Sequence, residues 1–365
     1  MARVLVADLE RVWRGGQEQA LLLMAGLKRC GHCVELVAVQ ESAIAARARA
    51  AGIRVHEVSD SARRIGAALR LRQLIREKSF DLVYANEAHA LTAAWLARTH
   101  RRVPLVVARR VAFPLSCSPI SRARYRAATR ILAISEAVRS QLLAAGLNAE
   151  CIAVVPDGVE IPEPISAATR EKARKRWGFR AEETVLVNVG ALTAEKGHAL
   201  LIEAFAKLRR GMTNCRLLIA GEGRLRAQLE HQAQEAGLGS AIIFAGFVPD
   251  VDSVYAAGDL FVFPSLQEGA GSSLLRAMAF GLPVLAFARG GVTEIIEDGT
   301  NGILVRQASA EALTWAAKGI LGASELRERL SAAGRETVAS RYSADRMIDA
   351  SARIFEELIS GRAAG

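Results

Sequence analysis

The stretch from Pro264 to Pro283 combines small residues, a carboxylate and a helical pattern in an order that suits anion binding. A loop with Glu268 and two glycines follows an apolar run, and the helical pattern begins near Ser272. The first N–H groups of a helix have no partner within it and lie at the positive end of its dipole, so they bind phosphate. Glu268 could accept hydrogen bonds from sugar hydroxyls. The alternative is an ordinary glycine-rich turn in which the serines cap the helix.

Glycines and a lysine also follow other apolar runs of the chain. In chain order they are Gly15, Gly16, Gly190, Lys196, Gly221 and Gly223. Loops at the carboxyl ends of parallel strands form the ligand sites of open α/β sheets. These residues are therefore expected to line such a site.

Residue sets for other kinds of chemistry are missing from the sequence. It contains no Ser/His/Asp combination and no cluster with metal-ligand spacing. We therefore expect metal-independent chemistry without a cofactor, in which fixed charges lower the barrier. Cys30 and Cys33 have the spacing of a redox pair, but they follow a helix instead of beginning one, so packing is their favoured role. Gly31 is the expected C-cap of that helix.

Short apolar runs alternate with helical patterns along the whole chain, which favours parallel sheets covered by helices on both faces. The first series of expected strands is 3–7, 34–39, 81–85, 105–108, 131–134 and 152–155. The second series is 185–189, 217–220, 242–244, 260–263, 284–287 and 303–305. The sequence thus predicts two doubly wound, Rossmann-like α/β domains joined near Ile161–Ile165.

Length, composition and charge agree with two globular domains. The 365 residues exceed what one core usually serves, and an apolar fraction of 51% argues against disorder. The net charge is +10, and residues 1–165 carry 24 Lys/Arg and 15 Asp/Glu against 24 and 23 in the rest. This excess indicates either an anionic partner or a solvated basic face.

The start of the chain has neither a secretory signal nor a membrane span, so we expect a cytoplasmic protein.

The order of the motifs resembles that of the retaining GT-B glycosyltransferases of family four, the glycosyl transferases group 1. Their pattern of Glu-Gly-aromatic-Gly, four residues, and Glu-Ala-Met-Ala-x-Gly-x-Pro is similar to residues 268–283. The other similar segments are Gly15-Gly16 with Glu18, Gly31-His32, residues 156–159, residues 190–197, residues 221–223 and residues 244–247. The resemblance covers essentially the whole chain.

The resemblance implies a GT-B fold, with two Rossmann-like domains that face each other across a cleft. Residues 1–164 with about 344–365 would form the acceptor-side domain, and 165–343 the nucleotide-sugar-binding domain. The implied activity is that of a retaining, metal-independent hexosyltransferase. It would move a hexose-type sugar from a nucleotide sugar to an acceptor and release a nucleotide diphosphate.

Site residues follow from the resemblance and from charge. The expected catalytic residues are Lys196, which would neutralise the departing diphosphate, Glu268, which would hold the sugar, and Arg109. The expected donor contacts are Gly15, Gly16, Gly190, Lys196, Gly221, Gly223, Phe247, Val248, Glu268, Gly269, Ala270, Gly271, Ser272, Ser273 and Arg276. The expected acceptor contacts are Arg14, His89, Arg109 and Arg110.

Three positions depart from the family pattern. Arg276 replaces the second Glu, Ala191 replaces an Arg that accompanies the Lys, and Arg109-Arg110 stand where many relatives have a His. We hypothesise that Arg276 reaches the phosphates or an edge of the ribose. The identity of the nucleotide stays open because a ribose-holding carboxylate is missing.

The basic first half is compatible with an anionic glycolipid or saccharide acceptor, such as a lipopolysaccharide core. The segment 61–78 has an amphipathic, basic pattern that could lie on an anionic leaflet, which would make the protein peripheral on the cytoplasmic face of the inner membrane. More often such a helix covers its own sheet, and that reading is favoured.

Other functions have less support. Arg276 and Ala191 are also compatible with a catalytically weak or inactive nucleotide-sugar-binding protein. A nicotinamide-dependent oxidoreductase is disfavoured because Arg226 stands in place of the third glycine of a Gly-x-Gly-x-x-Gly motif. Nucleic acid is not expected as a partner because stacking aromatics and known motifs are missing.

Overall fold

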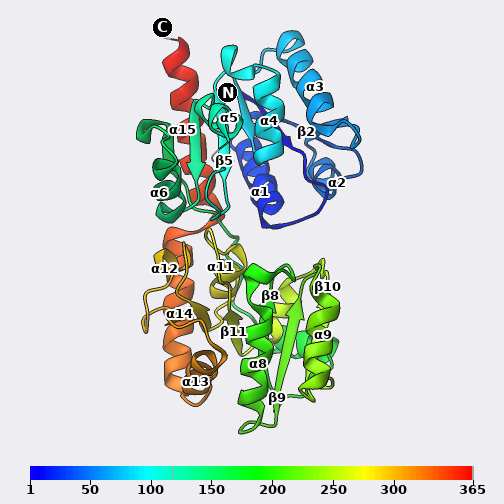
Figure 1. Ribbon diagram of the computed structural model, residues 1–365, viewed down its shortest axis with the longest axis vertical. Helices are drawn as coiled ribbons and strands as arrows, with labels where there is room; N and C mark the ends of the chain where they lie inside the picture. Colours follow the sequence, from blue (N-terminus) through cyan, green and yellow to red (C-terminus); the bar gives the residue numbers. More distant parts are fainter. Residues whose placement is uncertain (117, 364–365) are drawn as a thin grey trace. The chain divides into compact units, whose positions relative to one another are not determined.

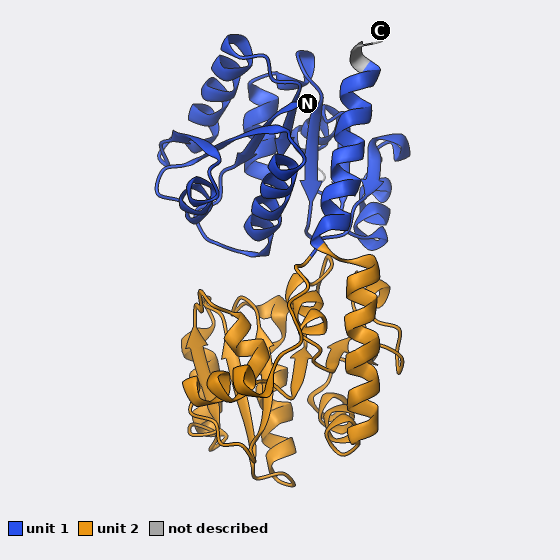
Figure 2. Ribbon diagram, turned by 180° about the vertical axis from the view of Figure 1, so that it is seen from behind, with its two compact units in different colours: residues 1–158, 344–365 blue, residues 159–343 orange. Residues whose placement is uncertain are grey.

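The computed structural model describes residues 1–116 and 118–363, and it divides into two compact units (Figure 2). Unit 1 contains Met1–Gly158 and the chain from Ala344 onward, and unit 2 contains Val159–Ser343. The folded chain thus divides after Gly158, whereas the sequence suggested a boundary after Pro164.

Unit 1 is built on a seven-stranded parallel sheet with the order β3-β2-β1-β4-β5-β6-β7 (Figure 1). The strands are β1 (Arg3–Asp8), β2 (Cys33–Val39), β3 (Arg54–Val58), β4 (Leu82–Ala85), β5 (Leu105–Arg109), β6 (Arg130–Ala133) and β7 (Ile152–Val154). Unit 2 is built on a six-stranded parallel sheet with the order β10-β9-β8-β11-β12-β13. Its strands are β8 (Thr184–Val189), β9 (Cys215–Ala220), β10 (Ile242–Gly246), β11 (Leu260–Phe263), β12 (Val284–Phe287) and β13 (Ile303–Val305). The two doubly wound sheets confirm the predicted fold class.

Strand β3 was missed by the sequence analysis. Its sequence, RVHEV, alternates exposed and buried residues because it forms the edge of the sheet. It therefore lacks the continuous apolar run by which the other strands were recognised.

Helices cover both faces of the unit 1 sheet. They are α1 (Gly15–Arg29), α2 (Ala43–Ala50), α3 (Arg63–Glu77), α4 (Ala88–Leu96), α5 (Pro119–Arg126), α6 (Glu136–Ala144) and α15 (Ala344–Ala363). Helices α1, α2 and α15 share a core with one face of the sheet, where Leu23, Ile44 and Phe355 are buried. Gly26 of α1 allows α15 to approach closely, because a Cβ there would lie 2.4 Å from Cδ1 of Ile348.

The redox-like cysteine spacing has a packing explanation. Gly31 has a φ of 84° just after α1, and Cys33 begins β2. Cys30 and Cys33 are free thiols after the end of the helix, Cys30 exposed and Cys33 partly buried, so neither begins a helix as a redox pair would.

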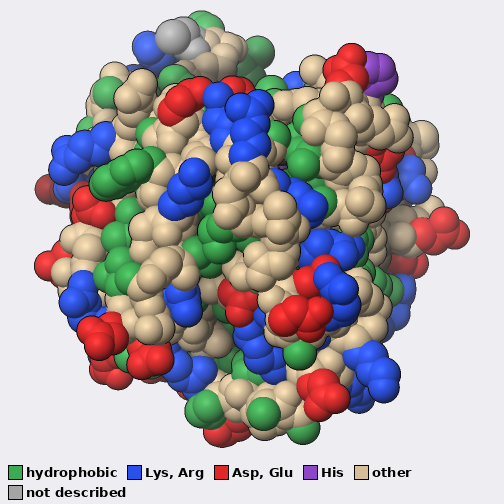
Figure 3. All heavy atoms as spheres, turned by 90° about the horizontal axis from the view of Figure 1, so that it is seen from below, with side chains coloured by type: hydrophobic (Ala, Val, Ile, Leu, Met, Phe, Trp, Pro, Cys, Tyr) green, Lys and Arg blue, Asp and Glu red, His purple; other side chains and the backbone are tan. Residues whose placement is uncertain are grey.

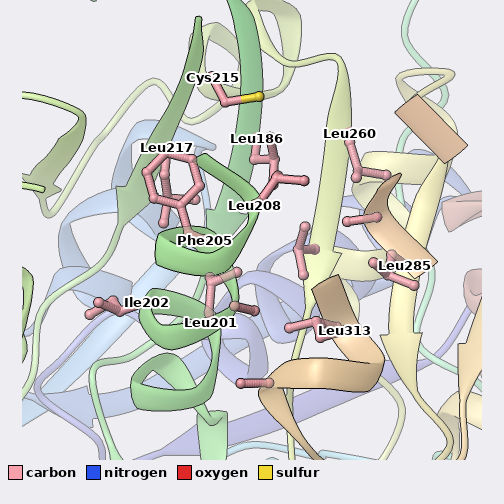
Figure 4. Close-up of a cluster of buried hydrophobic side chains, with 14 of the residues drawn as sticks. Leu186, Leu201, Ile202, Phe205, Leu208, Cys215, Leu217, Leu260, Leu285 and Leu313 are labelled. Atoms are coloured by element: carbon pink, nitrogen blue, oxygen red, sulfur yellow. The ribbon is translucent and has the colours of Figure 1, made fainter. Parts of the chain in front are cut away.

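The helices of unit 2 enclose a second apolar core (Figure 4), to which Phe205, Leu217 and Leu285 contribute. They are α7 (Ala167–Arg176), α8 (His198–Arg209), α9 (Arg226–Glu235), α10 (Asp252–Ala257), α11 (Ser272–Ala279), α12 (Val292–Ile295), α13 (Ala310–Leu321) and α14 (Ser324–Arg341). In the view of Figure 3, acidic and basic side chains are interspersed on the surface. Among the described residues, no helix has both the length and the apolar character that crossing a bilayer requires.

Candidate functional site

Each sheet has one point at which the strand order reverses direction. In unit 1 it lies between β1 and β4, and in unit 2 between β8 and β11. Loops that leave the carboxyl ends of such strands diverge and leave room for a ligand. Most of the residues singled out from the sequence follow these strands or their neighbours.

In unit 2, Lys196 and Glu268 meet between the loops that follow β8 and β11. Lys196 ends a short 3-10 helix, Ala194–Lys196, and its Nζ lies 2.6 Å from Oε2 of Glu268. The two side chains are 25% and 13% exposed, so the ion pair is only partly screened by water. The other carboxylate oxygen, Oε1, accepts the backbone N–H of Gly269 at 3.3 Å. Two of the three residues expected to be catalytic are thus in direct contact.

Backbone contacts hold these two loops together. The N–H of Leu266 donates to the carbonyl of Glu195 at 2.8 Å. Gly197 has a φ of 69°, and a Cβ there would lie 2.0 Å from the carbonyl oxygen of Pro264. A larger residue would therefore push the lysine loop away from the carboxylate loop. Gly290 has a φ of 53°, and a Cβ there would lie 2.1 Å from the carbonyl oxygen of Glu268.

The predicted helix after the carboxylate loop is α11, which begins at Ser272. Its N-cap, Gly271, has a φ of 101° and supplies no side-chain hydrogen bond. Among the described side chains none caps this helix, so its first-turn N–H groups stay open to an anion. Gly269, Ala270, Ser272 and Ser273 therefore lie where the sequence placed them.

The other expected donor contacts lie along the same edge of the unit 2 sheet. The backbone N–H of Gly190 donates to Ala220 at 3.0 Å, and that of Gly221 donates to Gly246 at 2.8 Å. Gly223 packs against the carbonyl of Leu192, which a Cβ would approach to 2.4 Å.

Phe247 and Val248 follow β10, at the outer edge of this sheet. Phe247 is 53% exposed. Strand β9 separates β10 from β8, the strand that precedes Lys196. These two residues therefore follow a strand that lies two positions along the sheet from the one before Lys196, and their contact with the donor stays a prediction.

Arg276 forms an ion pair within unit 2, and its contact with the phosphates or the ribose stays a prediction. Its Nη2 and Nε donate to Oδ1 of Asp252, at the start of α10, at 2.6 and 3.0 Å. The Asp252 side chain is 49% exposed and that of Arg276 is 25% exposed. The guanidinium is thus anchored to α10 by an ion pair that the sequence did not reveal.

Two buried polar residues beneath the lysine loop were missed by the sequence analysis. Nδ2 of Asn188, in β8, donates to the carbonyl of Val262 in β11 at 2.9 Å. Its Oδ1 lies 2.9 Å from Nε2 of His198. Burial and the nearby charge of Lys196 lower the pKa of His198 to about 4. His198 is therefore neutral at pH 7 and adds no charge beside the lysine.

In unit 1, Arg110 is the centre of a buried hydrogen-bond network. Its Nε donates to Oδ1 of Asp157 at 2.9 Å, its Nη2 to the hydroxyl of Tyr84 at 3.0 Å, and its Nη1 to Oδ1 of Asn86 at 2.5 Å. The side chain is only 14% exposed. Burial alone would lower the pKa of Arg110, but Tyr84 and Asp157 raise it overall. Arg110 was expected to contact an acceptor, whereas its geometry is that of a positioning cation.

The same network reaches the glycines at the start of α1. Nδ2 of Asn86 donates to the carbonyl of Gly16 at 3.0 Å and to Oδ2 of Asp8 at 2.6 Å. Gln17 donates to the same carboxylate oxygen at 3.0 Å. Burial raises the pKa of Asp8, although these hydrogen bonds oppose the rise. Gly15 and Gly16 form the start of the first turn of α1.

Glu87 is a partly buried residue at the start of α4. It accepts the backbone N–H groups of Leu9 at 3.2 Å, of Ala90 at 2.6 Å and of His89. Burial, and next the charge of Asp8, raise the pKa of Glu87 to about 7. This carboxyl therefore changes its charge near neutral pH.

His89 is held between α3 and the loop after β1. Its Nδ1 accepts from Nε of Arg64 at 2.9 Å, and its Nε2 lies 3.6 Å from Oε1 of Glu10. Glu10, Glu87 and His89 form the group of potential metal ligands found among the described residues. The Arg64 cation, bonded to the histidine nitrogen, disfavours a metal ion there.

Arg109 and Arg14 have separate environments. Arg109 donates to the carbonyl of Phe113 at 2.5 Å and to the hydroxyl of Tyr125 at 3.3 Å, which fixes the loop that follows β5. Arg14 is the exposed N-cap of α1. Neither residue is brought into the network of Arg110 by a described hydrogen bond.

Comparisons with known proteins identify a family for each half of the chain. Residues 169–337 match the family described as glycosyl transferases group 1. Residues 14–158 match the family described as glycosyl transferase 4-like domain. The two matched regions cover most of both units.

Individual relatives agree with these families. Over 192 residues the chain is 32% identical to the putative glycosyltransferase EpsD of Bacillus subtilis, which covers 53% of this chain and 50% of that protein. It is also 32% identical over 177 residues to the lipopolysaccharide core biosynthesis glycosyltransferase LpsE of Rhizobium meliloti, with coverages of 48% and 51%. The chain thus matches about half the length of these curated relatives.

A solved structure shows the same fold over nearly the whole chain. The crystal structure of Alr3699/HepE from Anabaena in complex with UDP and glucose superposes with a TM-score of 0.87. It covers 98% of this chain and 100% of that one, at 22% identity.

Proposed function

Because the chain belongs to the glycosyl transferases group 1, we propose that it transfers a sugar from a nucleotide-sugar donor to an acceptor. The observation that carries this proposal is the pairing of Lys196 with Glu268 beside the uncapped start of α11. A cation and free backbone N–H groups suit a diphosphate, and a neighbouring carboxylate suits the hydroxyl groups of a sugar.

Lys196 and Glu268 would contact two parts of the donor, the diphosphate and the sugar. In the protein without donor, the ammonium and the carboxylate neutralise each other at 2.6 Å. A diphosphate carries more negative charge than one carboxylate, so its arrival draws Lys196 toward it. Glu268 then has a free oxygen that can accept hydrogen bonds from the sugar. We propose that donor binding converts an internal ion pair into two separate contacts.

Lys196 also favours the chemical step. Negative charge grows on the diphosphate as the glycosidic bond breaks, and a fixed cation stabilises this charge more in the transition state than in the ground state. We propose that the reaction needs no metal ion and retains the anomeric configuration, with the leaving phosphate as the acceptor of the proton.

The carboxyl edge of the unit 1 sheet is proposed as the acceptor side. There, the network of Arg110, Asp157 and Asn86 fixes Gly16 and the loop after β4. Arg14 is the exposed N-cap of the helix that Gly15 and Gly16 begin, and Arg109 precedes Arg110 in the chain. We propose an anionic glycolipid or polysaccharide of the cell envelope as acceptor. The relation to a lipopolysaccharide core glycosyltransferase supports this class.

Transfer is tested by incubating the protein with UDP-, GDP- and ADP-sugars and measuring the free nucleotide diphosphate. We expect release with one nucleotide class, and faster release when the acceptor is added. The Lys196→Ala variant should lower this release at least about 100-fold. Release that is equal in the wild type and in Lys196→Ala would refute the assigned site.

A catalytically inactive sugar-nucleotide-binding protein is the second candidate, and Arg276 favours it. Its ion pair with Asp252 occupies the position at which relatives carry a carboxylate. Donor binding without any nucleotide release, with or without acceptor, would support this second function.

A further inference from the structure

Positive charge is concentrated in one part of unit 1. Residues 61–126 contain 14 Lys/Arg and three Asp/Glu, a net charge of +11, whereas the whole chain carries +10. This segment includes α3, α4, the 3-10 helix Thr99–Arg101 and α5. The basic excess of the protein is therefore a property of this segment.

The three acidic residues of this segment do little to neutralise its surface. Asp81 accepts the backbone N–H of Arg3 at 2.7 Å, and the side chain of Glu87 accepts N–H groups as the partly buried cap of α4. Glu77 is exposed and accepts from the side chain of Gln73. Arg72 and Arg76 of α3 are exposed, and no described residue forms an ion pair with them.

Helices α3, α4 and α5 lie next to one another in this order (Figure 1). Arg64 of α3 donates to His89 of α4 at 2.9 Å, and Arg124 of α5 donates to Thr92 of α4. Their outer sides form one surface, which we call the α3–α5 surface.

Large apolar side chains are exposed on the α3–α5 surface. Ile65 and Leu69 of α3 are 64% and 65% exposed, and Ile120 of α5 is 60% exposed. Leu96 at the end of α4 and Phe113 in the loop before α5 are each 47% exposed. Ile65 and Leu69 are one helical turn apart, and Arg72 and Arg76 continue the same stripe. This arrangement places apolar and cationic groups side by side.

A cationic pocket of about 540 Å³ adjoins this surface at α5. His100, Arg122 and Arg126 line it. Nε of Arg122 and Nδ1 of His100 are buried, and neither has a hydrogen-bond partner among the described residues. The guanidinium groups of Arg122 and Arg126 bring two cations to this pocket, and guanidinium N–H groups are strong donors to phosphate oxygens.

We propose that the α3–α5 surface docks on an anionic phospholipid bilayer, with a lipid phosphate in the pocket of Arg122 and Arg126. This inference deepens the proposed function, because it rests on an acceptor that is carried by a membrane. Arginines near an anionic leaflet attract it electrostatically, and exposed isoleucine and leucine side chains enter the boundary between headgroups and acyl chains. Two copies of so cationic a surface repel each other, which argues against self-association through it.

Vesicle sedimentation tests the proposal without donor, acceptor or activity. The purified protein is mixed with vesicles of phosphatidylcholine alone, or of phosphatidylcholine with phosphatidylglycerol. We expect binding to the second kind alone, and weaker binding as salt is raised. The double variant Arg72→Glu/Arg76→Glu should lower the partition coefficient roughly 30-fold or more. The variant Ile65→Ser/Leu69→Ser should also weaken binding, although it keeps the net charge.

Matched variants in unit 2 serve as controls. Arg210→Glu/Arg329→Glu changes the net charge equally at two other exposed arginines, and Trp315→Ala removes a side chain that is 81% exposed. Both should bind vesicles like the wild type. Circular dichroism and melting temperature should show that every variant is folded.

Several results would overturn the proposal. They are equal losses of binding in the control and test variants, no binding to anionic vesicles at low salt, and a dimer that Ile65→Ser/Leu69→Ser converts to a monomer. Binding to duplex RNA that exceeds vesicle binding and is unaffected by the apolar variant would assign the surface to nucleic acid. Nucleotide-sugar turnover with a soluble acceptor is measured separately, so its presence or absence does not alter this result.

Discussion

The pair of Lys196 and Glu268 makes a prediction that a double-mutant cycle can test. Replacing Lys196 by Met removes the ammonium and keeps most of the apolar side chain. Glu268, which is 13% exposed, would then retain the N–H of Gly269 at 3.3 Å as its described hydrogen-bond donor. A charged group that loses its partner in such a site destabilises the folded state.

The structure sets the size of the effect. A hydrogen bond to a charged group contributes about 1.5–3 kcal/mol, and partial exposure of both side chains places this pair near the lower end, at about 2 kcal/mol. The melting temperature of the unit should then fall by roughly 4–8 °C. Glu268→Gln should cost less, about 1 kcal/mol, because the ammonium that it leaves unpaired is more exposed. The double variant should recover about 1–2 kcal/mol relative to the sum of the single variants.

Chemical denaturation of the four proteins, followed by fluorescence, measures these free energies of unfolding. Lys172→Met, at an exposed lysine of α7, is the matched control and should leave stability unchanged. Strict additivity of Lys196→Met and Glu268→Gln would refute the conclusion that the two side chains form an ion pair in solution.

Three further predictions concern other parts of the structure. Glu87→Gln should flatten the dependence of the free energy of unfolding on pH. The pKa of Glu87 is about 7 in the folded state, above the usual 4.5, so between these values the folded chain keeps a proton that the unfolded chain releases. As the pH rises through this interval, the wild type should therefore lose about 3 kcal/mol of stability. Denaturation of the wild type and of the variant at pH 5 and pH 8 measures how the free energy of unfolding of each changes with pH. An equal change in the two proteins would contradict the raised pKa. Gly290→Ala should destabilise the protein by more than about 2 kcal/mol, because Gly290 has a positive φ and an added Cβ would collide with the backbone of Glu268. Gly239→Ala is the control, because a Cβ at Gly239 meets open space, and it should change stability by less than about 1 kcal/mol. Equal melting curves for the two variants would disprove the close approach of Gly290 to Glu268. Arg276→Glu should lower the melting temperature by placing two carboxylates together, and the additional change Asp252→Lys should restore it; no recovery in the double variant would argue against the ion pair.

The sequence revealed the donor half-site because its residues follow apolar strands directly. Lys196 and Glu268 each stand in a glycine-containing loop after a recognisable strand, so the strand order alone brings them to one edge. Their direct contact was not predicted, because it depends on how closely the two loops approach. That approach is allowed by Gly197 and Gly290, which are unremarkable when read in isolation.

The environment of Arg110 could not be read from the sequence. Its partner Asp157 lies 47 positions away, and Tyr84 and Asn86 come from a different strand. The two adjacent arginines were expected to contact an acceptor, whereas the side chain of Arg110 is only 14% exposed and is held by these partners. Asp8, Asn86 and Asn188 did carry a signal, since each is a polar residue at or near the carboxyl end of an apolar strand.

The ion pair of Arg276 with Asp252 is another contact that the sequence did not predict. The departure from the family pattern was visible, but its partner Asp252 lies on α10, and nothing in the spacing of the two residues indicates a contact. The structure adds an ion pair with a carboxylate to a cation for which the sequence suggested only a contact with the donor.

Binding of nucleoside diphosphates is the most direct test of the donor half-site. Calorimetric titration of the wild type with UDP, GDP and ADP should show binding of at least one of them, and Lys196→Ala should weaken it at least about tenfold. The Lys172→Ala control should bind like the wild type. If none of the three nucleotides binds, or if Lys196→Ala binds as tightly as the wild type, the proposed role of the Lys196–Glu268 site is wrong.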